Sequence, residues 1–229
     1  MISEPAHVHR LLADVKHVLF DFDGPICAIF AGLPAPTIAA TLRDYLAPLA
    51  LDLPPDIRAQ VDPLEILRYA PTAGPLVAET VEAGLRGLEL QAALTATPTP
   101  GTANVIKQLR TSGRRLAVVS NNSDAAIKTY TENHGLLAYF DHISARALFQ
   151  DPALLKPHPY LINQALNALS ADPALTILIG DSVTDIESAK TAEILSIGYA
   201  NSTTKAQLLH NAGANAVISD MVQLIPLPT

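Results

Sequence analysis

Short apolar runs alternate with amphipathic stretches along most of the chain. An apolar run without polar alternation is typical of a strand buried on both faces, and apolar residues three or four apart are typical of a helix. The predicted strands are residues 15–22, 115–119, 142–144, 176–180, 195–199 and 214–218. The predicted helices between them are residues 102–111, 125–134, 160–169, 186–192 and 205–211. Repeated strand–helix units predict an α/β fold with a Rossmann-like, doubly wound parallel sheet.

The segment between residues 31 and 96 has a different pattern. It lacks β-branched alternation, and prolines separate helical stretches at residues 37–49, 64–69 and 76–94. The sequence Thr-Pro-Thr-Pro-Gly at residues 97–101 then indicates a linker. We therefore predict a core domain made of residues 1–30 and 97–229, with residues 31–96 inserted as a helical domain.

Composition narrows the class of protein. The chain has 229 residues, 49% hydrophobic and 16% charged, which is enough for a sizeable core. A net charge of -7 makes a nucleic-acid partner unexpected. No signal-peptide core and no apolar run long enough for a membrane span is evident, and Cys27 is the only cysteine, so a cytoplasmic location is expected. Cys27 itself is interpreted as a packed side chain, because no histidine lies beside it in sequence to activate it.

Two carboxylates end the first predicted strand. Asp21 and Asp23 follow the apolar run Val-Leu-Phe at residues 18–20, and Gly24 and Pro25 then break the strand. Unpaired charge at the end of a buried strand is costly and usually accompanies a cation or a mechanism. Alternation along a strand puts the two acids on one side, about 6–7 Å apart at their α-carbons. One could attack a substrate while the other moves protons.

Polar residues also end two other strands. Ser120 and Asn121 follow residues 115–119, and Asp181 and Asp185 follow residues 176–180. Taken singly, these could be turn or helix-capping residues. Ligands of parallel sheets bind outside the carboxyl ends of the strands, so we expect these side chains to share one crevice. Oxygen ligands without a His or Cys cluster favour Mg²⁺, and Lys156 adds a fixed positive charge. Such a set suits a phosphoryl group.

These residues give the sequence its resemblance to a known family. Asp21-Phe-Asp23, Ser120, Lys156 and the stretch Gly-Asp-Ser-Val-Thr-Asp ending at Asp185 resemble, in order, the four motifs of the haloacid dehalogenase (HAD) superfamily. The inserted helices are similar to those of its branch with a helical cap after the first motif, which includes phosphoglycolate phosphatases. Pro25 departs from the motif, which usually has Thr or Val there, and a proline would stiffen the exit toward the cap.

The resemblance implies a Mg²⁺-dependent phosphatase that acts on a small-molecule phosphate ester. It implies that Asp21 is the nucleophile, that Asp23 is the general acid and base, and that Ser120, Asn121 and Lys156 hold the phosphoryl group. It further implies that Mg²⁺ is held by Asp21, Asp181, the backbone carbonyl of Asp23 and, as an outer contact, Asp185. Members that cleave carbon–halogen bonds lack an acid at the position of Asp23, which argues against a dehalogenase.

Two alternatives and several details stay open at this point. A phosphomutase would return the phosphoryl group to its substrate, and a non-catalytic relative would bind a partner through its cap. The substrate class is expected to be phosphoglycolate or a sugar phosphate, and the oligomeric state is not predicted. Candidates for reading the leaving group are the cap residues Arg58, Arg68, Tyr69 and Arg86. Three histidines are interpreted as surface or packing residues, because they lack the spacing of a metal site: His134, His142 and His158.

Overall fold

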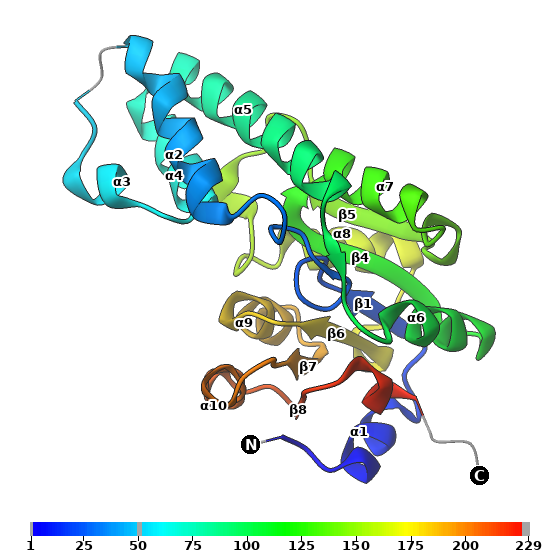
Figure 1. Cartoon of the computed structure of the whole chain (residues 1–229). Helices are drawn as coiled ribbons and strands as arrows, with labels where there is room; N and C mark the ends of the chain where they lie inside the picture. The colour runs from blue at the N-terminus through cyan, green and yellow to red at the C-terminus, as the bar shows by residue number, and fades with distance from the viewer. Residues whose placement is uncertain (1, 50–51, 226–229) are drawn as a thin grey trace.

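One parallel sheet forms the centre of the molecule. The computed structural model describes residues 2–49 and 52–225, so residues 1, 50–51 and 226–229 of the predicted domains lie outside the described residues. Six strands of the described chain pair in parallel in the order β5-β4-β1-β6-β7-β8 (Figure 1). Their bounds are β1 His17–Phe20, β4 Arg115–Ser123, β5 His142–Arg146, β6 Thr176–Gly180, β7 Leu195–Tyr199 and β8 Ala216–Ile218. The predicted doubly wound α/β fold is confirmed.

Helices cover both faces of this sheet. Alternate side chains of β1 point to opposite sides, so that Val18 and Phe20 join one apolar cluster and Leu19 joins another. The first cluster receives side chains of α1 Pro5–Leu12, α6 Thr102–Thr111 and α7 Asp124–Asn133. The second receives side chains of α8 Tyr160–Leu169 and α9 Val183–Thr191, while α10 Thr203–Ala212 packs beside α9 against β7 and β8. Both faces of the strands are therefore buried, which explains their continuous apolar runs.

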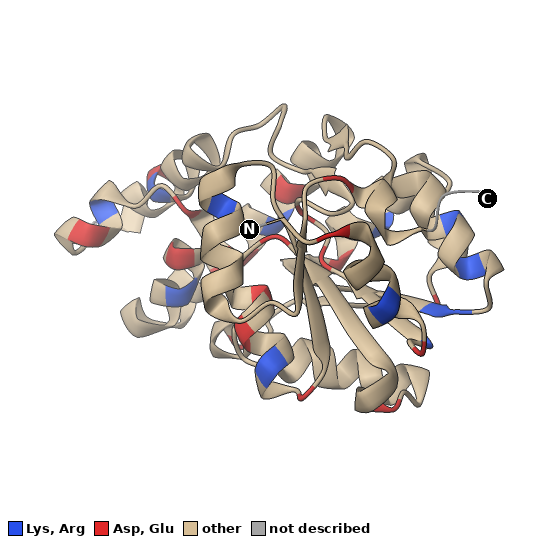
Figure 2. Ribbon diagram, turned by 90° about the horizontal axis from the view of Figure 1, so that it is seen from below, with Lys and Arg blue, Asp and Glu red and all other residues tan. Residues whose placement is uncertain are grey.

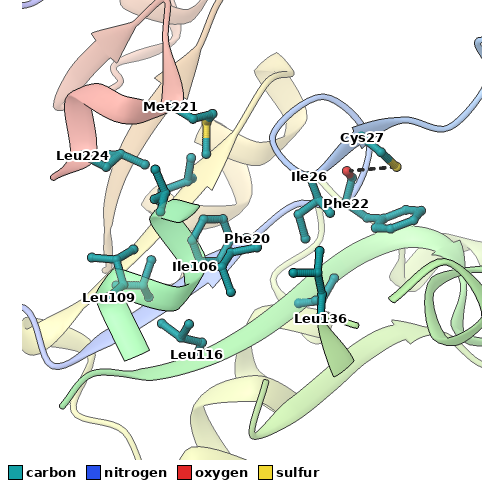
Figure 3. Close-up of a cluster of buried hydrophobic side chains, with 14 of the residues drawn as sticks. Phe20, Phe22, Ile26, Cys27, Ile106, Leu109, Leu116, Leu136, Met221 and Leu224 are labelled. Atoms are coloured by element: carbon teal, nitrogen blue, oxygen red, sulfur yellow. Dashed lines mark hydrogen bonds between the residues drawn. The ribbon is translucent and has the colours of Figure 1, made fainter. Parts of the chain in front are cut away.

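The first apolar cluster includes Phe20 and Phe22, the two residues that flank Asp21. Figure 3 shows Phe20, Ile106 and Leu109 close together, with Ile26, Phe22 and Cys27 at the end nearest the loop that follows β1. The Cys27 side chain is fully buried, and its thiol faces the backbone carbonyl of Phe22 at 4.0 Å. Burial, followed by the charges of Asp23 and Asp21, raises the pKa of Cys27 above its ordinary value. A thiol held protonated in this way is a packing residue rather than a nucleophile.

The helical segment inserted after β1 packs as a group at one end of the molecule (Figure 1). Its helices are α2 Ala35–Leu46, α3 Pro55–Ala59, α4 Pro63–Tyr69 and α5 Pro75–Leu94. The Asp62 carboxylate accepts from the Leu64 amide at 2.8 Å and caps α4 as predicted. The two chain connections to this segment run side by side, because β2 Cys27–Ala28 pairs antiparallel with β3 Thr97–Pro98.

Some element boundaries differ from the predicted ones. Strand β1 ends at Phe20 rather than residue 22, because the Asp21 carboxylate accepts from the next amide and turns the chain. Strand β4 continues through Ser123, so Ser120 and Asn121 belong to a strand rather than to a turn. Helices α1 and α3 were not predicted, because each is short and buries few residues: Val8 and Leu12 in α1, and Ile57 in α3. None of the described helices is both long and apolar enough to span a membrane.

Charged residues of both signs are distributed over helices and loops. In Figure 2 the strands of the sheet are largely uncharged, and the red and blue segments lie mainly on the surrounding helices and on the loops at the strand ends. The exceptions that matter for chemistry are buried charged residues near the carboxyl ends of β1, β5 and β6.

Candidate active site

The carboxyl ends of three neighbouring strands carry the predicted site residues. Asp21 follows β1, Ser120 and Asn121 lie near the end of β4, and Asp181 follows β6. Strand β1 pairs with β4 on one side and with β6 on the other, so these ends are adjacent. Strand order, which the sequence does not display directly, thus brings these residues together at the carboxyl end of the sheet, and this group is called the strand-end site below.

Lys156 lies at the centre of the strand-end site. Its Nζ is 2.9 Å from Asp21 Oδ1, contacts Asp185 Oδ1, and donates to the Val119 carbonyl at 3.0 Å. Only 2% of the lysine side chain is exposed. Burial opposes its charge, but the carboxylates of Asp185 and Asp21 outweigh this and raise the pKa of Lys156 above its ordinary value. Lys156 is therefore a permanent cation whose single charge is shared between two buried acids.

Three carboxylates form an acidic cluster around that ammonium group. One oxygen from each of Asp21, Asp181 and Asp185 lies within 4.8 Å of the others. Burial, with the neighbouring charge of Asp185, raises the pKa of Asp21 to about 7, even though Lys156 acts in the opposite direction. Burial likewise raises the pKa of Asp181 to about 6. Carboxylates this close together and this buried repel one another when ionised, so they either hold protons or bind a hard cation.

Asp185 differs from the other two acids because its oxygens already have donors. Oδ1 contacts Lys156, while Oδ2 accepts from the Ser182 hydroxyl at 2.7 Å and from the amides of Ser182 and Asp181. Although burial opposes ionisation, Lys156 and Ser182 hold the pKa of Asp185 below its ordinary value. Gly180 permits this arrangement, since a Cβ there would lie 2.4 Å from the Asp185 side chain. Asp185 is thus a fixed anion that caps α9 and anchors Lys156.

Asp23 stands apart from the cluster. Its Oδ1 accepts from the Ile29 amide at 3.0 Å, and its side chain does not belong to the group of three carboxylates. Burial is the main cause that raises the pKa of Asp23 to about 6. A half-buried carboxyl with a pKa close to neutrality is able both to give and to accept a proton at physiological pH.

Ser120 and Asn121 are the residues that β4 contributes to the strand-end site. The Ser120 hydroxyl donates to Asn122 Oδ1 at 3.3 Å and accepts from the Asn122 amide at the same distance. The Asn121 side chain bonds both backbone groups of Lys156, accepting from N–H at 2.8 Å and donating to C=O at 3.2 Å. Asn121 therefore fixes the loop that carries the lysine, a role that residue type and spacing do not reveal.

One charged residue next to the strand-end site was not predicted. The Lys205 ammonium, at the start of α10, contacts Asp181 Oδ2 and is about one quarter exposed. Asp181 is confined on its other side, because Gly24 has φ +90° and a Cβ there would lie 2.4 Å from the aspartate carboxyl group. In the sequence Lys205 looks like an ordinary helix lysine, and the only signal was its position just after the end of β7.

Comparison with known proteins decides the family. Residues 78–199 match the family model of haloacid dehalogenase-like hydrolases. The chain is 32% identical over 188 residues to "Probable phosphatase IndB" of Dickeya dadantii, an alignment that covers 79% of each chain. The chain belongs to the haloacid dehalogenase-like hydrolases.

Other proteins are similar to the chain in sequence or in fold. Identity is 32% over 134 residues with a plasmid-encoded phosphoglycolate phosphatase of Cupriavidus necator, which covers 57% of this chain and 55% of that one. A predicted phosphatase from Clostridium acetobutylicum has the same fold, with a TM-score of 0.71 and 21% identity over 92% of this chain and 96% of that one. CbbY of Rhodobacter sphaeroides, solved with phosphate, has a TM-score of 0.66 and 20% identity over 92% and 96%. This haloacid dehalogenase-like hydrolase is a phosphatase.

The arginines expected to recognise the leaving group of the substrate form ion pairs within the protein. Arg58 pairs with the exposed Asp52, Arg68 with Glu65 and the Lys156 carbonyl, and Arg86 with Asp124. Tyr69 is half-buried at the end of α4. Each of these three arginines has a carboxylate partner in this arrangement, and their role in recognising a leaving group stays a prediction. As predicted, the three histidines are not part of the metal-type cluster found in the described residues: His134 stacks on Tyr130, His142 is half-buried and His158 is exposed.

Proposed function

We propose that this phosphatase is a Mg²⁺-dependent hydrolase of small-molecule phosphate monoesters that works through an aspartyl-phosphate intermediate on Asp21. The observation that carries the proposal is the contact of Lys156 Nζ with both Asp21 and Asp185, inside a cluster of three carboxylates. A fixed ammonium beside a buried carboxylate is suited to bind a phosphoryl dianion next to the oxygen that attacks it.

The proposed chemistry divides between the two acids of the first motif. The Asp21 carboxylate attacks phosphorus, and Lys156 holds it in place and stabilises its charge. Asp23 gives its proton to the leaving oxygen and then takes a proton from the water that hydrolyses the intermediate. Its pKa of about 6 suits both steps, because the carboxyl need only change protonation near neutral pH. Ser120 and the backbone near Asn121 hold the phosphoryl oxygens.

The residues of the acidic cluster fit a magnesium ion. The donors are carboxylate oxygens, with no His or Cys among the described residues of the cluster. Asp21, Asp181 and the backbone carbonyl of Asp23 are the proposed direct ligands, and Asp185 is the outer contact because Lys156 and Ser182 already use its oxygens. When bound, Mg²⁺ would neutralise the oxygens of the transferring phosphoryl group.

The inserted helices are proposed to form the cap of residues 31–96 over a core of residues 1–30 and 97–229. The antiparallel pair of β2 and β3 supports these boundaries, because both connections run through it. Pro25 lies in the first of them and removes one backbone donor there. A cap placed beside the strand-end site would select the leaving group and exclude water from the phosphoryl site.

The substrate is proposed to be of the phosphoglycolate or sugar-phosphate type. The support comes from the names of similar proteins: one relative is a phosphoglycolate phosphatase, and a CbbY structure was solved with xylulose-1,5-bisphosphate. Steady-state kcat/KM values for 2-phosphoglycolate and a panel of sugar phosphates, measured as release of inorganic phosphate with Mg²⁺ present, would rank these substrates.

The direct test uses p-nitrophenyl phosphate. We expect Mg²⁺-dependent hydrolysis that EDTA abolishes and added Mg²⁺ restores, and we expect Asp21→Asn to be inactive while still folded. A fully active Asp21→Asn protein would exclude Asp21 as the nucleophile. Conversion of a sugar phosphate to its isomer without release of inorganic phosphate would identify a phosphomutase instead. Absence of turnover with every ester of the panel would favour a non-catalytic, partner-binding role.

A further inference from the structure

A buried ion cluster joins α5 to the end of β5, and it is separate from the three carboxylates of the strand-end site. Arg146 is the last residue of β5, and its side chain is completely buried. Its guanidinium contacts Glu82 and, at 2.6 Å, Glu89, both on α5 and both with side chains at most 5% exposed. Its Nε–H donates to the backbone carbonyl of Asn121 at 3.1 Å. One arginine therefore links the inserted helices to the β4 strand end that carries Ser120.

Glu89 extends the same cluster along the chain. Its Oε2 accepts from the Ser123 amide at 2.9 Å, and its Oε1 accepts from the Asn122 side chain at 3.3 Å. The pairing of β4 with β5 is irregular between Ser120 and Ser123, so regular ladder bonds do not hold this segment. Arg146 and Glu89 supply the bonds that the ladder omits. Residues 120–123 owe their position to side chains of two other elements.

The position of this segment matters because Asn121 in turn holds Lys156. The Asn121 carbonyl is fixed by Arg146, and the Asn121 side chain bonds the amide and the carbonyl of Lys156. Arg146 forms no hydrogen bond or ion pair with Asp21 or with the lysine ammonium; its bonds go to Asn121, Glu82 and Glu89. We therefore expect any effect of Arg146 on catalysis to pass through the segment of residues 120–123.

Stability alone does not explain three buried charged groups. A buried Arg–Glu cluster contributes little more than well-packed apolar residues of similar size, whereas loss of one partner is strongly destabilising. A guanidinium nevertheless fixes several acceptors in one geometry, which an apolar side chain cannot do. We propose that Arg146, with Glu89, is a positioning residue that sets the Ser120–Asn121 segment and, through it, Lys156; the inference rests on the proposed function for its catalytic consequence.

The decisive variant removes Arg146 without changing the net charge of the cluster. In Arg146→Met/Glu82→Gln, one positive and one negative group are lost together, and Glu89 keeps its bonds to Asn122 and Ser123. We expect a folded protein in which the amides of Asn122 and Lys156 exchange hydrogen at least about tenfold faster than in the wild type. With p-nitrophenyl phosphate we expect kcat to fall by about ten- to a hundredfold, because a small misplacement of catalytic groups is costly.

Two further variants keep the proposal falsifiable. Glu82→Gln alone leaves Arg146 bonded to Glu89 and Asn121, and should keep wild-type kcat and wild-type exchange at Asn122 and Lys156. Arg146→Lys keeps the charge but loses the planar guanidinium group. If the double variant does not fold, Arg146→Lys should still show faster exchange at Asn122 and Lys156 and a lower kcat. Wild-type exchange and kcat in either Arg146 variant would overturn the proposal. If the wild-type protein hydrolyses no ester, the proposed function fails, while the exchange rates still test whether Arg146 positions Asn121 and Lys156.

Discussion

The amide side chain of Asn121 brackets the backbone of Lys156, accepting from its N–H at 2.8 Å and donating to its C=O at 3.2 Å. The two residues are far apart in sequence, and the pair of bonds resembles one rung of a sheet. Strand β4 thereby dictates where the loop after β5 places its lysine. The position of the Lys156 ammonium group is thus set by the Asn121 side chain as well as by the carboxylates that it contacts.

Replacement of Asn121 tests this relationship. Asn121→Ala removes both bonds. The Lys156 carbonyl keeps its bond from Arg68, but the buried Lys156 N–H loses its partner at a cost of about 1–3 kcal/mol in the free energy of unfolding. We expect kcat with p-nitrophenyl phosphate to fall at least about tenfold, because the ammonium is no longer held against Asp21. Asn163→Ala, at an exposed position on α8, is the matched control and should retain wild-type kcat and thermal midpoint. Full activity in Asn121→Ala would show that Lys156 is placed by its ion pairs alone.

Asp23→Asn separates binding from proton transfer. Its amide oxygen still accepts from Ile29, so the loop after β1 should keep its shape. We expect Mg²⁺ affinity measured by calorimetry to remain close to that of the wild type, while kcat falls by about 10²–10⁴-fold because no acid protonates the leaving oxygen. The loss should be smaller for p-nitrophenyl phosphate, whose leaving group needs no proton, than for an alkyl phosphate. Equal rates in the wild type and the variant would exclude an acid–base role.

The pKa values of the acidic residues predict how magnesium stabilisation depends on pH. Asp21, Asp23 and Asp181 have pKa values raised to about 7, about 6 and about 6, chiefly by burial. Each holds its proton more tightly in the folded metal-free protein than in the unfolded chain, so their contribution to stability falls as pH rises through these values. The contribution of Asp185 to stability depends on pH in the opposite direction, because its lowered pKa gives stability that is lost only at acid pH.

Metal ligands must be deprotonated, so Mg²⁺ should stabilise the protein more at high pH. We expect the rise in melting temperature caused by Mg²⁺ to grow between pH 5.5 and pH 8, with most of the change near pH 6–7. Differential scanning calorimetry with and without Mg²⁺ measures this directly, and Asp181→Asn is the matched variant in which the increment should nearly disappear. An increment that is constant over this pH range would contradict the proposed ligand set.

Lys205 should weaken metal binding at Asp181. Its ammonium contacts the same carboxylate that is proposed to bind Mg²⁺, and two cations beside one carboxylate repel each other. At pH 8 we therefore expect Lys205→Met to lower the Mg²⁺ concentration for half-maximal activity by about two- to tenfold, in line with a partly screened charge. Calorimetric Mg²⁺ affinity should change in the same direction. A higher Mg²⁺ requirement in Lys205→Met would instead mean that the lysine orients Asp181 for the metal.

Much of the fold follows from local pattern. Apolar runs without alternation mark strands buried on both faces, and those strands proved to form one parallel sheet. The Asp62 cap, the long helix α5 and the segment between β2 and β3 are visible because proline and capping residues act over a few positions. Helix α3 and the extension of β4 through Ser123 were missed, because tertiary packing outweighs their weak local preference.

The sequence by itself determined the chemical groups: acids at the ends of β1 and β6, a serine and an asparagine on β4, and a lysine after β5. The order of these groups along the chain was enough to indicate the haloacid dehalogenase-like family. Tertiary structure alone decided which charges meet. Lys205 with Asp181, Asn121 with Lys156, and Arg146 with two glutamates of α5 are each joined by strand order and by long-range burial. Such contacts depend on the desolvation of groups distant in sequence, which no spacing within one segment encodes.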